Sequence, residues 1–452
     1  MQMLSIADLL RATNGTIKRY EPYETEIIKI TTDSRTAEKG SLFIPLKGER
    51  SDGHDYIDDV LKTGAASLTE RKDLYPEGVV IGVADTRVAL GDIARFYKNK
   101  YNLPTVSITG SVGKTTTKDL VFSVLSEHYK THKTPNNFNN DIGVPLTLFG
   151  IEKEHEAVVV EMGMNHFGEI SYLAGIVKPD CAVITNIGMS HIENLGSQEG
   201  ILKAKLEITE HFGKDNTLFI NGDDEYLKTV KSKDYKIVRF GLDDANDVYA
   251  KNIVNNGLDG TAFTVVYEKG EFDLTLRQPG EHNIYNALAA VSVGLHMGVT
   301  EKECARGVEN CIYTSSRLEI IKNNGLEIIN DCYNSSPSSV RAALEVMSLS
   351  LKPRKVAVLG DILEMGEYSK DAHYKLGADV NKYADALITA GEMARYIADG
   401  AKASGMENVK SFSSTAELKD KIKDLVGDGD CVLIKASHGM TFCDITEVLR
   451  EN

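Results

Sequence analysis

The sequence predicts an α/β protein of three domains: a small α/β domain, a central domain on a mostly parallel sheet, and a smaller doubly wound domain. Three observations predict this class. The chain has 452 residues, which suggests about three domains at roughly 150 residues each. Short apolar strands alternate with helical patterns. A glycine-containing loop separates one such strand from the next helix. We place the domains at residues 1–98, 99–313 and 314–452.

The first domain is expected to hold short strands at 26–35 and 40–46 and a helix from residue 53 that ends at Gly64. A helix over 86–102 leads out of it. The central domain then alternates, with strands at 105–109, 156–163 and 181–187 and helices at 115–129, 168–178 and 281–298. The last of these helices is expected to close the central domain and to stop at Gly298. βα repeats of this kind imply a mostly parallel sheet with helices on both faces.

The third domain repeats the alternation on a smaller scale. Strands are expected at 325–333, 354–362, 384–391 and 430–437, and a helix at 338–349. This succession is typical of a doubly wound, Rossmann-like domain, in which ligands bind at the carboxyl ends of the strands.

Composition and charge narrow the class of protein. With 42% hydrophobic and 26% charged residues, the chain has the balance of a soluble globular protein. Its net charge of −15 argues against a nucleic-acid partner. No apolar run approaches the roughly 20 residues of a membrane span, and the N-terminus lacks a signal-peptide layout. These features predict a cytoplasmic protein without membrane insertion, and we expect a monomer.

The six cysteines are scattered, at positions 181, 304, 311, 332, 431 and 443. No two form a CxxC pair, so the sequence indicates neither a disulfide framework nor a zinc site. This usage fits a reducing compartment. We therefore expect that disulfides do not hold the fold together.

The sequence SITGSVGKTTTKD (residues 107–119) resembles a nucleotide-binding loop only in its second half. The strict pattern G-x-x-x-x-G-K-[ST] requires glycine where this chain has Ile108. Backbone N–H groups between a strand and a helix can nevertheless converge on phosphate oxygens. Lys114 would reach the β and γ phosphates, and the Thr115 hydroxyl would bind Mg²⁺. The predicted nucleotide-binding set is Gly110, Ser111, Val112, Gly113, Lys114, Thr115 and Thr116.

Other polar residues end neighbouring strands at the same predicted edge. Glu161 could complete a Mg²⁺ shell, since hard cations prefer oxygen ligands, or could be a solvated carboxylate. His191 follows a third strand and could be a ligand or a structural histidine. The asparagine-rich segment that contains Asn137 and Asn140 is either a turn-rich loop or a substrate loop.

In chain order, these segments resemble the Mur ligase family of ATP-dependent peptide synthetases. The resemblance covers nearly the whole chain and includes the variant phosphate loop itself. It is carried by TGSVGKTTTK, NNFNNDIGVPLTL, VEMGMNHFGEI, VITNIGMSHIENLGS, KAKLEI, GEHNIYNALAA, DCYNSSPSS and VLGDILEMGEYSKDAH. The DCYNSSP and LGDILEMGE stretches resemble the member that joins D-alanyl-D-alanine to UDP-N-acetylmuramoyl-tripeptide.

This resemblance implies a reaction and its partners. ATP and Mg²⁺ would activate the tripeptide carboxylate as an acyl phosphate, and the amine of D-alanyl-D-alanine would then attack it. The catalytic residues implied are Lys114, Glu161, His191 and Lys205. Metal ligands would be Thr115, Glu161, His191 and a carbamylated Lys205. Nucleotide contacts would add Asn283, Asn286, Arg317, Asp331 and Asn334, and substrate contacts would be Ser34, Arg35, Lys47, Asn137 and Asn140.

The chain departs from the family pattern at two positions, and two rival interpretations of its function remain. Asn330 stands where an aspartate is usual, and His438 where a permanent positive charge is usual. A sibling ligase that adds the third peptide residue, or a P-loop protein that uses ATP as a switch, are the alternatives. The third residue of the tripeptide, lysine or diaminopimelate, is not encoded in any motif.

Overall fold

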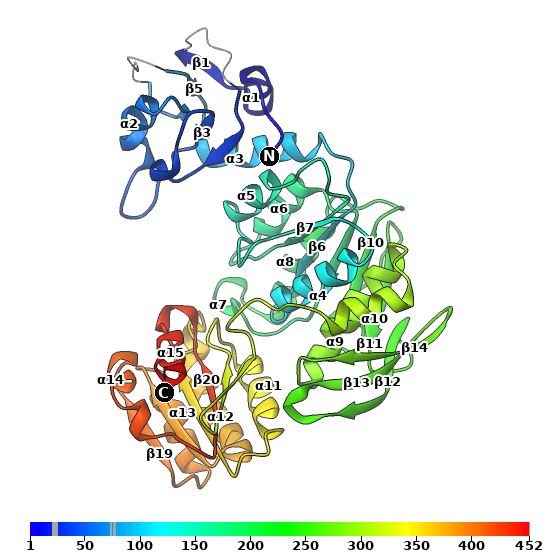
Figure 1. Cartoon of the computed structure of the whole chain (residues 1–452), viewed down its shortest axis with the longest axis vertical. Coiled ribbons are helices and arrows are strands. Elements are labelled where there is room, and N and C mark those ends of the chain that lie inside the picture. Colours follow the sequence, from blue (N-terminus) through cyan, green and yellow to red (C-terminus); the bar gives the residue numbers. More distant parts are fainter. Residues whose placement is uncertain (20–25, 73–74, 76–77, 452) are drawn as a thin grey trace.

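The computed structural model describes residues 1–19, 26–72, 75 and 78–451 and contains three sheets in succession along the chain (Figure 1). Within these residues, five strands form the N-terminal sheet, nine the central sheet and six the C-terminal sheet. The central body lies between the other two. The predicted fold class, three α/β domains, is confirmed.

The N-terminal sheet has the order β1-β5-β4-β3-β2 and is parallel except for β1. Its strands are β1 Thr16–Arg19, β2 Lys29–Thr31, β3 Ser41–Phe43, β4 Ala66–Thr69 and β5 Val80–Gly82. The helices are α1 Ile6–Thr13, α2 Ile57–Lys62 and α3 Thr86–Lys98. Asp85 caps α3 by accepting from the backbone N–H of Arg87 and Val88. Helix α3 also fastens this unit to the central one, because Tyr97 Oη donates to Ile151 O at 2.6 Å.

The central sheet has the order β14-β13-β12-β11-β10-β9-β6-β8-β7. Its strands are β6 Thr105–Thr109, β7 Thr131–Lys133, β8 Ala157–Glu161, β9 Cys181–Ile184, β10 Thr217–Asn221, β11 Lys236–Gly241, β12 Val248–Asn255, β13 Thr261–Tyr267 and β14 Gly270–Leu276. The helices are α4 Lys114–Ser126, α5 Gly143–Phe149, α6 Glu169–Val177, α7 Ile192–Leu195, α8 Gln198–Leu206, α9 Glu281–His296 and α10 Glu301–Glu309.

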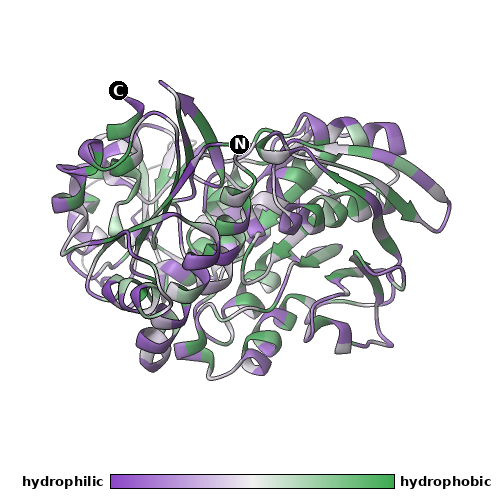
Figure 2. Cartoon of the chain, turned by 90° about the horizontal axis from the view of Figure 1, so that it is seen from below, coloured by the Kyte–Doolittle hydropathy of each residue, from purple (hydrophilic) through white to green (hydrophobic). Residues whose placement is uncertain are grey.

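Successive side chains along the central strands point to opposite faces of the sheet, and each face is covered by a hydrophobic core. Val158 and Val160 of β8 face the core beneath α5 and α6, whereas Val159 faces the core beneath α4 and α9. Seen from below in Figure 2, hydrophobic segments run through the strands and the inner sides of helices, and hydrophilic segments lie outside. Because β6, β8 and β9 run parallel, their carboxyl ends lie at one edge of this sheet.

The C-terminal sheet has the order β15-β16-β20-β17-β18-β19 and is parallel except for β15. Its strands are β15 Glu319–Asn323, β16 Leu326–Asn330, β17 Arg354–Gly360, β18 Ala386–Ala390, β19 Val409–Phe412 and β20 Asp430–Lys435. The helices are α11 Pro337–Ser348, α12 Ser369–Tyr383, α13 Ala394–Ala403, α14 Thr415–Lys419 and α15 Cys443–Arg450. Ser336 caps α11 by accepting from Ser339 N.

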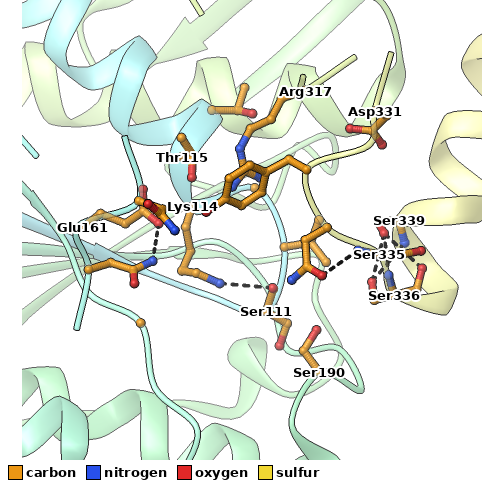
Figure 3. A pocket seen from close by; sticks show the side chains of 18 of the residues that line it. Ser111, Lys114, Thr115, Glu161, Ser190, Arg317, Asp331, Ser335, Ser336 and Ser339 are labelled. Carbon is orange, nitrogen blue, oxygen red and sulfur yellow. Dashed lines mark hydrogen bonds between the residues drawn. The ribbon is translucent and has the colours of Figure 1, made fainter. Parts of the chain in front are cut away.

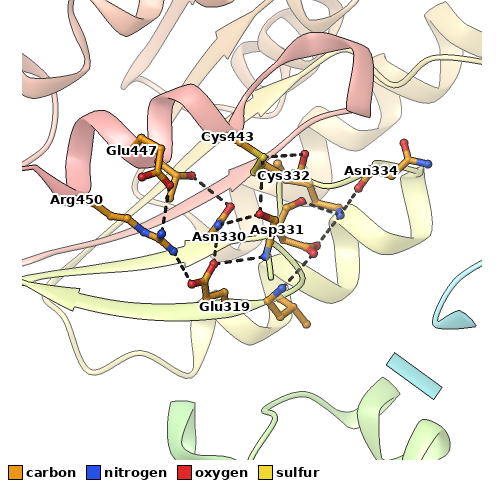
Figure 4. Close-up of a disulfide and its surroundings, with 12 residues drawn as sticks. Glu319, Asn330, Asp331, Cys332, Asn334, Cys443, Glu447 and Arg450 are labelled. Carbon is orange, nitrogen blue, oxygen red and sulfur yellow. Dashed lines mark hydrogen bonds and ion pairs between the residues drawn. A yellow bond between two sulfur atoms is a disulfide. The ribbon is translucent and has the colours of Figure 1, made fainter. Parts of the chain in front are cut away.

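Two expectations about the fold are wrong. Helix α9 is not the last of the central domain, because α10 follows after Gly298 and is capped by Thr300. The expectation about disulfides also fails: Cys332 and Cys443 form one between the end of β16 and α15 (Figure 4). Sequence spacing could not reveal this pair, since 111 residues separate the two cysteines and only the fold brings their Cα atoms to 5.5 Å.

No helix among the described residues combines the length and the apolar character that crossing a bilayer requires.

Candidate functional site

The phosphate loop occupies residues 110–113, between β6 and α4. Steric crowding requires glycine at two of its positions. Gly110 has φ +152°, and a Cβ there would lie 1.9 Å from Thr185 Oγ1. Gly113 has φ +83°, and its Cβ would lie 2.7 Å from Asn286 Oδ1. Asn186 fixes the loop from the end of β9, because its side chain accepts from Val112 N and donates to Val112 O. This short loop therefore has a defined shape without the glycine of the strict pattern.

The N-terminus of α4 opens into the same space. Gly113 supplies no side chain that could cap the helix, so the first N–H groups point outward as anion donors. Lys114 Nζ turns back and donates to Gly110 O at 2.8 Å and Ser111 O at 3.3 Å (Figure 3). Burial lowers the pKa of Lys114, and nearby Arg317 adds to this, while Glu161 and Glu364 oppose it.

At the start of α4 and the end of β8, two buried oxygens have no hydrogen-bond partner in the described structure: Thr115 Oγ1 and Glu161 Oε2, the latter at an ion-pair distance of 3.9 Å from Lys118 Nζ. The other oxygen of Glu161, Oε1, accepts from Asn139 Nδ2 at 2.8 Å. Since unsatisfied buried oxygens are costly, this pair suits a hard cation. No group of three or more acidic, histidine or cysteine side chains in the described residues could hold a metal alone. Mg²⁺ fits here with phosphate oxygens and water as its other ligands, as is usual for this ion.

His191 stands at the start of α7 and faces the same space as Lys114. Its Nδ1 lies 2.8 Å from Glu364 Oε2, an ion-pair distance, although the two atoms are not aligned as a hydrogen bond. Glu364 belongs to the C-terminal domain, so this contact crosses the boundary between domains.

The asparagine-rich loop lies over Glu161. Asn137 and Asn140 both line the cavity, and Asn140 Oδ1 also accepts from Gly143 N at the start of α5. The asparagine that contacts the carboxylate is Asn139, which the sequence did not single out. Its position in the same run of asparagines was the available signal.

The C-terminal domain supplies the opposite wall. Asp331 accepts from Leu318 N at 3.2 Å and pairs with Lys435 Nζ at 2.5 Å. The guanidinium of Arg317 stacks 4.0 Å from the ring centroid of Tyr333. Lys435 and Tyr333 were not predicted from the sequence, because only the folded sheet places β20 beside the end of β16.

These walls enclose a cavity of about 400 Å³ (Figure 3). Most of the predicted site residues line it: Ser111, Val112, Gly113, Lys114, Thr115, Thr116, Asn137, Asn140, Glu161, His191, Asn283, Asn286, Arg317, Asp331 and Asn334. Gly110 shapes the loop behind them. A second cavity, of about 330 Å³, continues from the loop past Asn286, Tyr285 and His282. Burial lowers the pKa of His282 to about 4, so its imidazole is neutral at pH 7, while Asp223, Asp224, Glu281 and Glu345 give the same cavity an acidic lining.

Comparison with known proteins follows the same three parts of the chain. Residues 26–98 match the model described as Mur ligase family, catalytic domain, residues 108–294 the Mur ligase middle domain, and residues 316–438 the Mur ligase glutamate ligase domain. The UDP-N-acetylmuramoyl-tripeptide–D-alanyl-D-alanine ligase of Bacillus subtilis strain 168 is 38% identical, covering 99% of this chain and 98% of that protein. The chain belongs to the Mur ligase family.

Solved Mur ligase structures share its architecture. A crystal structure of MurF from Acinetobacter baumannii aligns over 100% of both chains, with a TM-score of 0.93 and 33% identity. MurF from Thermotoga maritima in complex with ADP aligns over 94% of this chain and 97% of that one, with a TM-score of 0.84 and 27% identity.

Lys205 of this Mur ligase lies in α8, 2% exposed, and is not among the residues that line the cavity. Burial holds its pKa well below the usual value, and the charge of Lys114 adds to the effect. Its neighbour Lys203 is exposed, with Nζ 5.8 Å from the ring centroid of Phe167. The two lysines of this helix therefore differ in environment, although a role in metal binding stays a prediction.

The N-terminal residues predicted to bind substrate lie on a separate body. Arg35 is exposed and pairs with Asp33 at 2.7 Å, within the turn Ser34–Thr36 that Asp33 caps. Lys47 pairs with Glu70 at 2.7 Å. None of these residues lines the cavity described above. Both cations are at the surface and accessible to an anionic ligand.

The two departures from the family pattern have different surroundings. Asn330 is buried away from the cavity, donates to Glu319 Oε2 and accepts from Thr446 Oγ1 (Figure 4). Its amide therefore belongs to the attachment of α15. His438 does line the cavity, with its ring centroid 5.5 Å from that of Tyr333.

Proposed function

We propose that this chain is the ATP-dependent ligase that joins D-alanyl-D-alanine to UDP-N-acetylmuramoyl-tripeptide, a step in the synthesis of the peptidoglycan precursor. The full-length likeness to a ligase of that name supports the choice of substrates. One structural observation carries the mechanism. A phosphate loop on one domain faces Arg317 and Asp331 of another across a single cavity. We further propose that the enzyme acts in the cytoplasm as a monomer.

The phosphate loop would bind the triphosphate of ATP. The open N-terminus of α4 supplies backbone donors, and Lys114 exchanges its contacts with Gly110 O and Ser111 O for phosphate oxygens. The second cavity, beside Asn286 and His282, would take the nucleoside. Arg317 would meet the phosphates from the C-terminal side.

Thr115 and Glu161 would hold Mg²⁺, since each presents a buried oxygen with no hydrogen-bond partner in the described structure. Bound there, Mg²⁺ supplies charge that offsets the negative charge of the transferring phosphoryl group. His191 and a carbamylated Lys205 would serve a second ion.

The chemistry needs positioning and charge rather than a covalent enzyme nucleophile. The tripeptide carboxylate attacks the γ-phosphorus, forming an acyl phosphate and releasing ADP. The amine of the dipeptide then attacks the carbonyl carbon, and phosphate leaves as the amide forms. Lys114 and Arg317 would stabilise the charge that develops in the first step.

The UDP end of the substrate would bind the N-terminal domain. Arg35 and Lys47 are exposed cations on an otherwise acidic chain, and a diphosphate would compete with Asp33 and Glu70 for them. Ser34 begins the same short turn as Arg35.

Two rivals are less favoured. Structures of sibling enzymes, such as the 2,6-diaminopimelate ligase, are only 16% identical and share the fold alone. An ATP-dependent switch protein would not need a cavity shared by two domains. It would also not need the surface cations Arg35 and Lys47 of the N-terminal domain.

The direct test supplies the purified protein with ATP, Mg²⁺, a UDP-N-acetylmuramoyl-tripeptide and D-alanyl-D-alanine, and follows the pentapeptide product by mass spectrometry. Two tripeptides, ending in lysine or in diaminopimelate, would reveal the third residue. L-alanyl-L-alanine is the matched control acceptor. ADP release that is independent of the dipeptide, without pentapeptide, would overturn the proposal.

A further inference from the structure

One contact between the central and C-terminal domains joins two residues of unusual backbone conformation. His191, at the start of α7, and Glu364, in the loop after β17, both have φ +61°. Neither is glycine, and non-glycine residues in this region are uncommon and concentrate at functional sites. His191 Nδ1 and Glu364 Oε2 are 2.8 Å apart.

The loop that carries Glu364 also contacts α7 through a second residue, Gly366. Gly366 follows Glu364 by two residues and begins the short 3₁₀ helix η6 Gly366–Tyr368. It has φ +50°, and a Cβ there would lie 3.0 Å from Glu193 Cγ on α7. The loop at 364–366 thus packs directly on residues 191–193. A side chain at position 366 would adopt a strained backbone conformation and require the Glu193 side chain to shift by a few tenths of an ångström.

The ring of His191 has two nitrogens with different surroundings. Nδ1 is buried, and Glu364 is the carboxylate that faces it. His191 also lines the cavity with Lys114 and Glu161, which leaves Nε2 as the nitrogen available to the cavity. Histidines that bind metals in proteins commonly donate their other ring N–H to a carboxylate, which fixes tautomer and orientation. In this structure Nδ1 and Oε2 lie at ion-pair distance without hydrogen-bond alignment, so the carboxylate is in place beside the ring but the bond itself is part of the proposal.

We propose that Glu364 is a positioning residue that orients His191 toward a metal ion in the cavity, and that it does so from the opposite domain. This rests on the proposed function, which places a second Mg²⁺ beside the phosphate loop. The carboxylate reaches His191 only when the C-terminal domain is docked. Docking of that domain therefore completes the metal site as well as the nucleotide site.

The test measures metal binding without turnover. Mn²⁺ replaces Mg²⁺ in the presence of a methylene-bridged ATP analogue, and pulsed electron paramagnetic resonance detects nitrogen coupled to the ion. Wild-type protein should show a coupled imidazole nitrogen that is lost in His191→Ala. Glu364→Ala should weaken that signal and lower the affinity for Mn²⁺ by about 10–100-fold. Glu364→Gln, which keeps an oxygen acceptor of the same size, should lose less.

Glu367→Ala is the matched control, because Glu367 is exposed in the neighbouring turn and does not line the cavity. Circular dichroism would show that each variant is folded. If Glu364 acts through His191, adding Glu364→Ala to His191→Ala should cause no further loss of Mn²⁺ affinity.

Three results would overturn the proposal: no nitrogen coupling in the wild type, unchanged Mn²⁺ binding in Glu364→Ala, or a further loss in the double variant. A rise confined to the KM of D-alanyl-D-alanine would also overturn it, since Glu364 would then contact the dipeptide. Failure of the proposed function is distinguishable, because it would appear as absent pentapeptide synthesis in wild-type protein, which the binding measurement does not require.

Discussion

At the scale of single residues, Thr115 and Glu161 are two side chains whose hydrogen bonding the folded chain leaves incomplete. Each contributes a buried oxygen without a hydrogen-bond partner in the described structure, at the edge where α4 begins. A buried acceptor left unsatisfied costs about 1–3 kcal/mol, or more when it is charged. A site that is completed by a cation and a nucleotide accounts for this cost, because the missing partner arrives with the ligand.

Lys114→Ala should lower the rate of ligation by about 10³-fold, the scale of losing one preorganised charge. The reason is geometric: Nζ already lies over the loop, within reach of Gly110 O and Ser111 O, where phosphate oxygens would bind. Steady-state kinetics with saturating substrates measures the effect. Retention of a tenth of the wild-type turnover would contradict the role of Lys114.

Lys205→Ala should lose most activity, about 100-fold, and Lys203→Ala little, because only Lys205 is buried. Burial, and next to it the charge of Lys114, lowers the pKa of Lys205, which favours the neutral amine, the form that reacts with CO₂ to give an anionic carbamate. ¹³C-labelled bicarbonate should give a carbamate resonance in wild-type protein that is absent from Lys205→Ala.

Acetate or another short carboxylate should partly restore the Lys205→Ala variant by placing an anion in the vacated space. Greater damage from Lys203→Ala than from Lys205→Ala would show that the two lysines had been assigned the wrong way round.

At this scale the sequence predicted residue types better than partners. Strand ends and the loop pattern placed Lys114, Thr115 and Glu161 at one edge. Asn139 and Lys435 escaped prediction because their importance depends on which side chain lies opposite, and that is decided by tertiary packing. Asn330 illustrates the converse, since a departure beside Asp331 in sequence faces away from the cavity in space.

Among the elements, those with strong local patterns formed as predicted. Strands β6, β8 and β9 are continuous apolar runs, typical of a sheet covered on both faces, and each was predicted within a few residues. Helix α10 and strands β12 to β14 were not predicted. Strands β12 and β14 are half exposed, and the three strands pair as an antiparallel extension, so their hydrophobic pattern is weaker than that of the buried parallel strands.

The start of α3 depends on Glu70, a residue of the loop after β4. Its Oε1 accepts from Thr86 N and Thr86 Oγ1, each at 2.9 Å, and Oε2 pairs with Lys47. Partial burial raises its pKa, but the hydrogen bonds from Lys47 and Thr86 outweigh this and lower it to about 2. This stabilisation is present above the unfolded-state pKa of about 4.5 and is lost as the pH falls toward 2.

Glu70→Gln should therefore reduce the free energy of unfolding by about 1–2 kcal/mol at pH 7, and the difference from wild type should shrink below pH 4.5. Urea unfolding followed by circular dichroism measures this at several pH values. Glu49→Gln, at an exposed site in the same domain, is the control and should show no such trend. A gap that stays constant with pH would contradict the ionic origin of the effect.

At the scale of the whole molecule, the site exists only between domains. The loop at 110–113 and the pair Arg317 and Asp331 are on different sheets, and the surface cations Arg35 and Lys47 are on the third. The three-sheet plan could be predicted from alternation, but the sequence holds no local signal for how the sheets are placed around a shared cavity. That arrangement comes from contacts such as Tyr97 with Ile151 and His191 with Glu364.

Binding of both nucleotide and UDP substrate should draw the three domains together, because each holds part of the reacting assembly and closure excludes water from the acyl phosphate. A compact body of this length has a radius of gyration of about 22 Å. Small-angle scattering should show a larger radius for the ligand-free protein and a fall toward that value with an ATP analogue plus UDP-N-acetylmuramoyl-tripeptide. Lys114→Ala should compact less at equal ligand concentrations, since its hold on the phosphates is weaker. An unchanged radius with both ligands bound would mean that the domains are already closed in solution, and closure on binding would then be wrong.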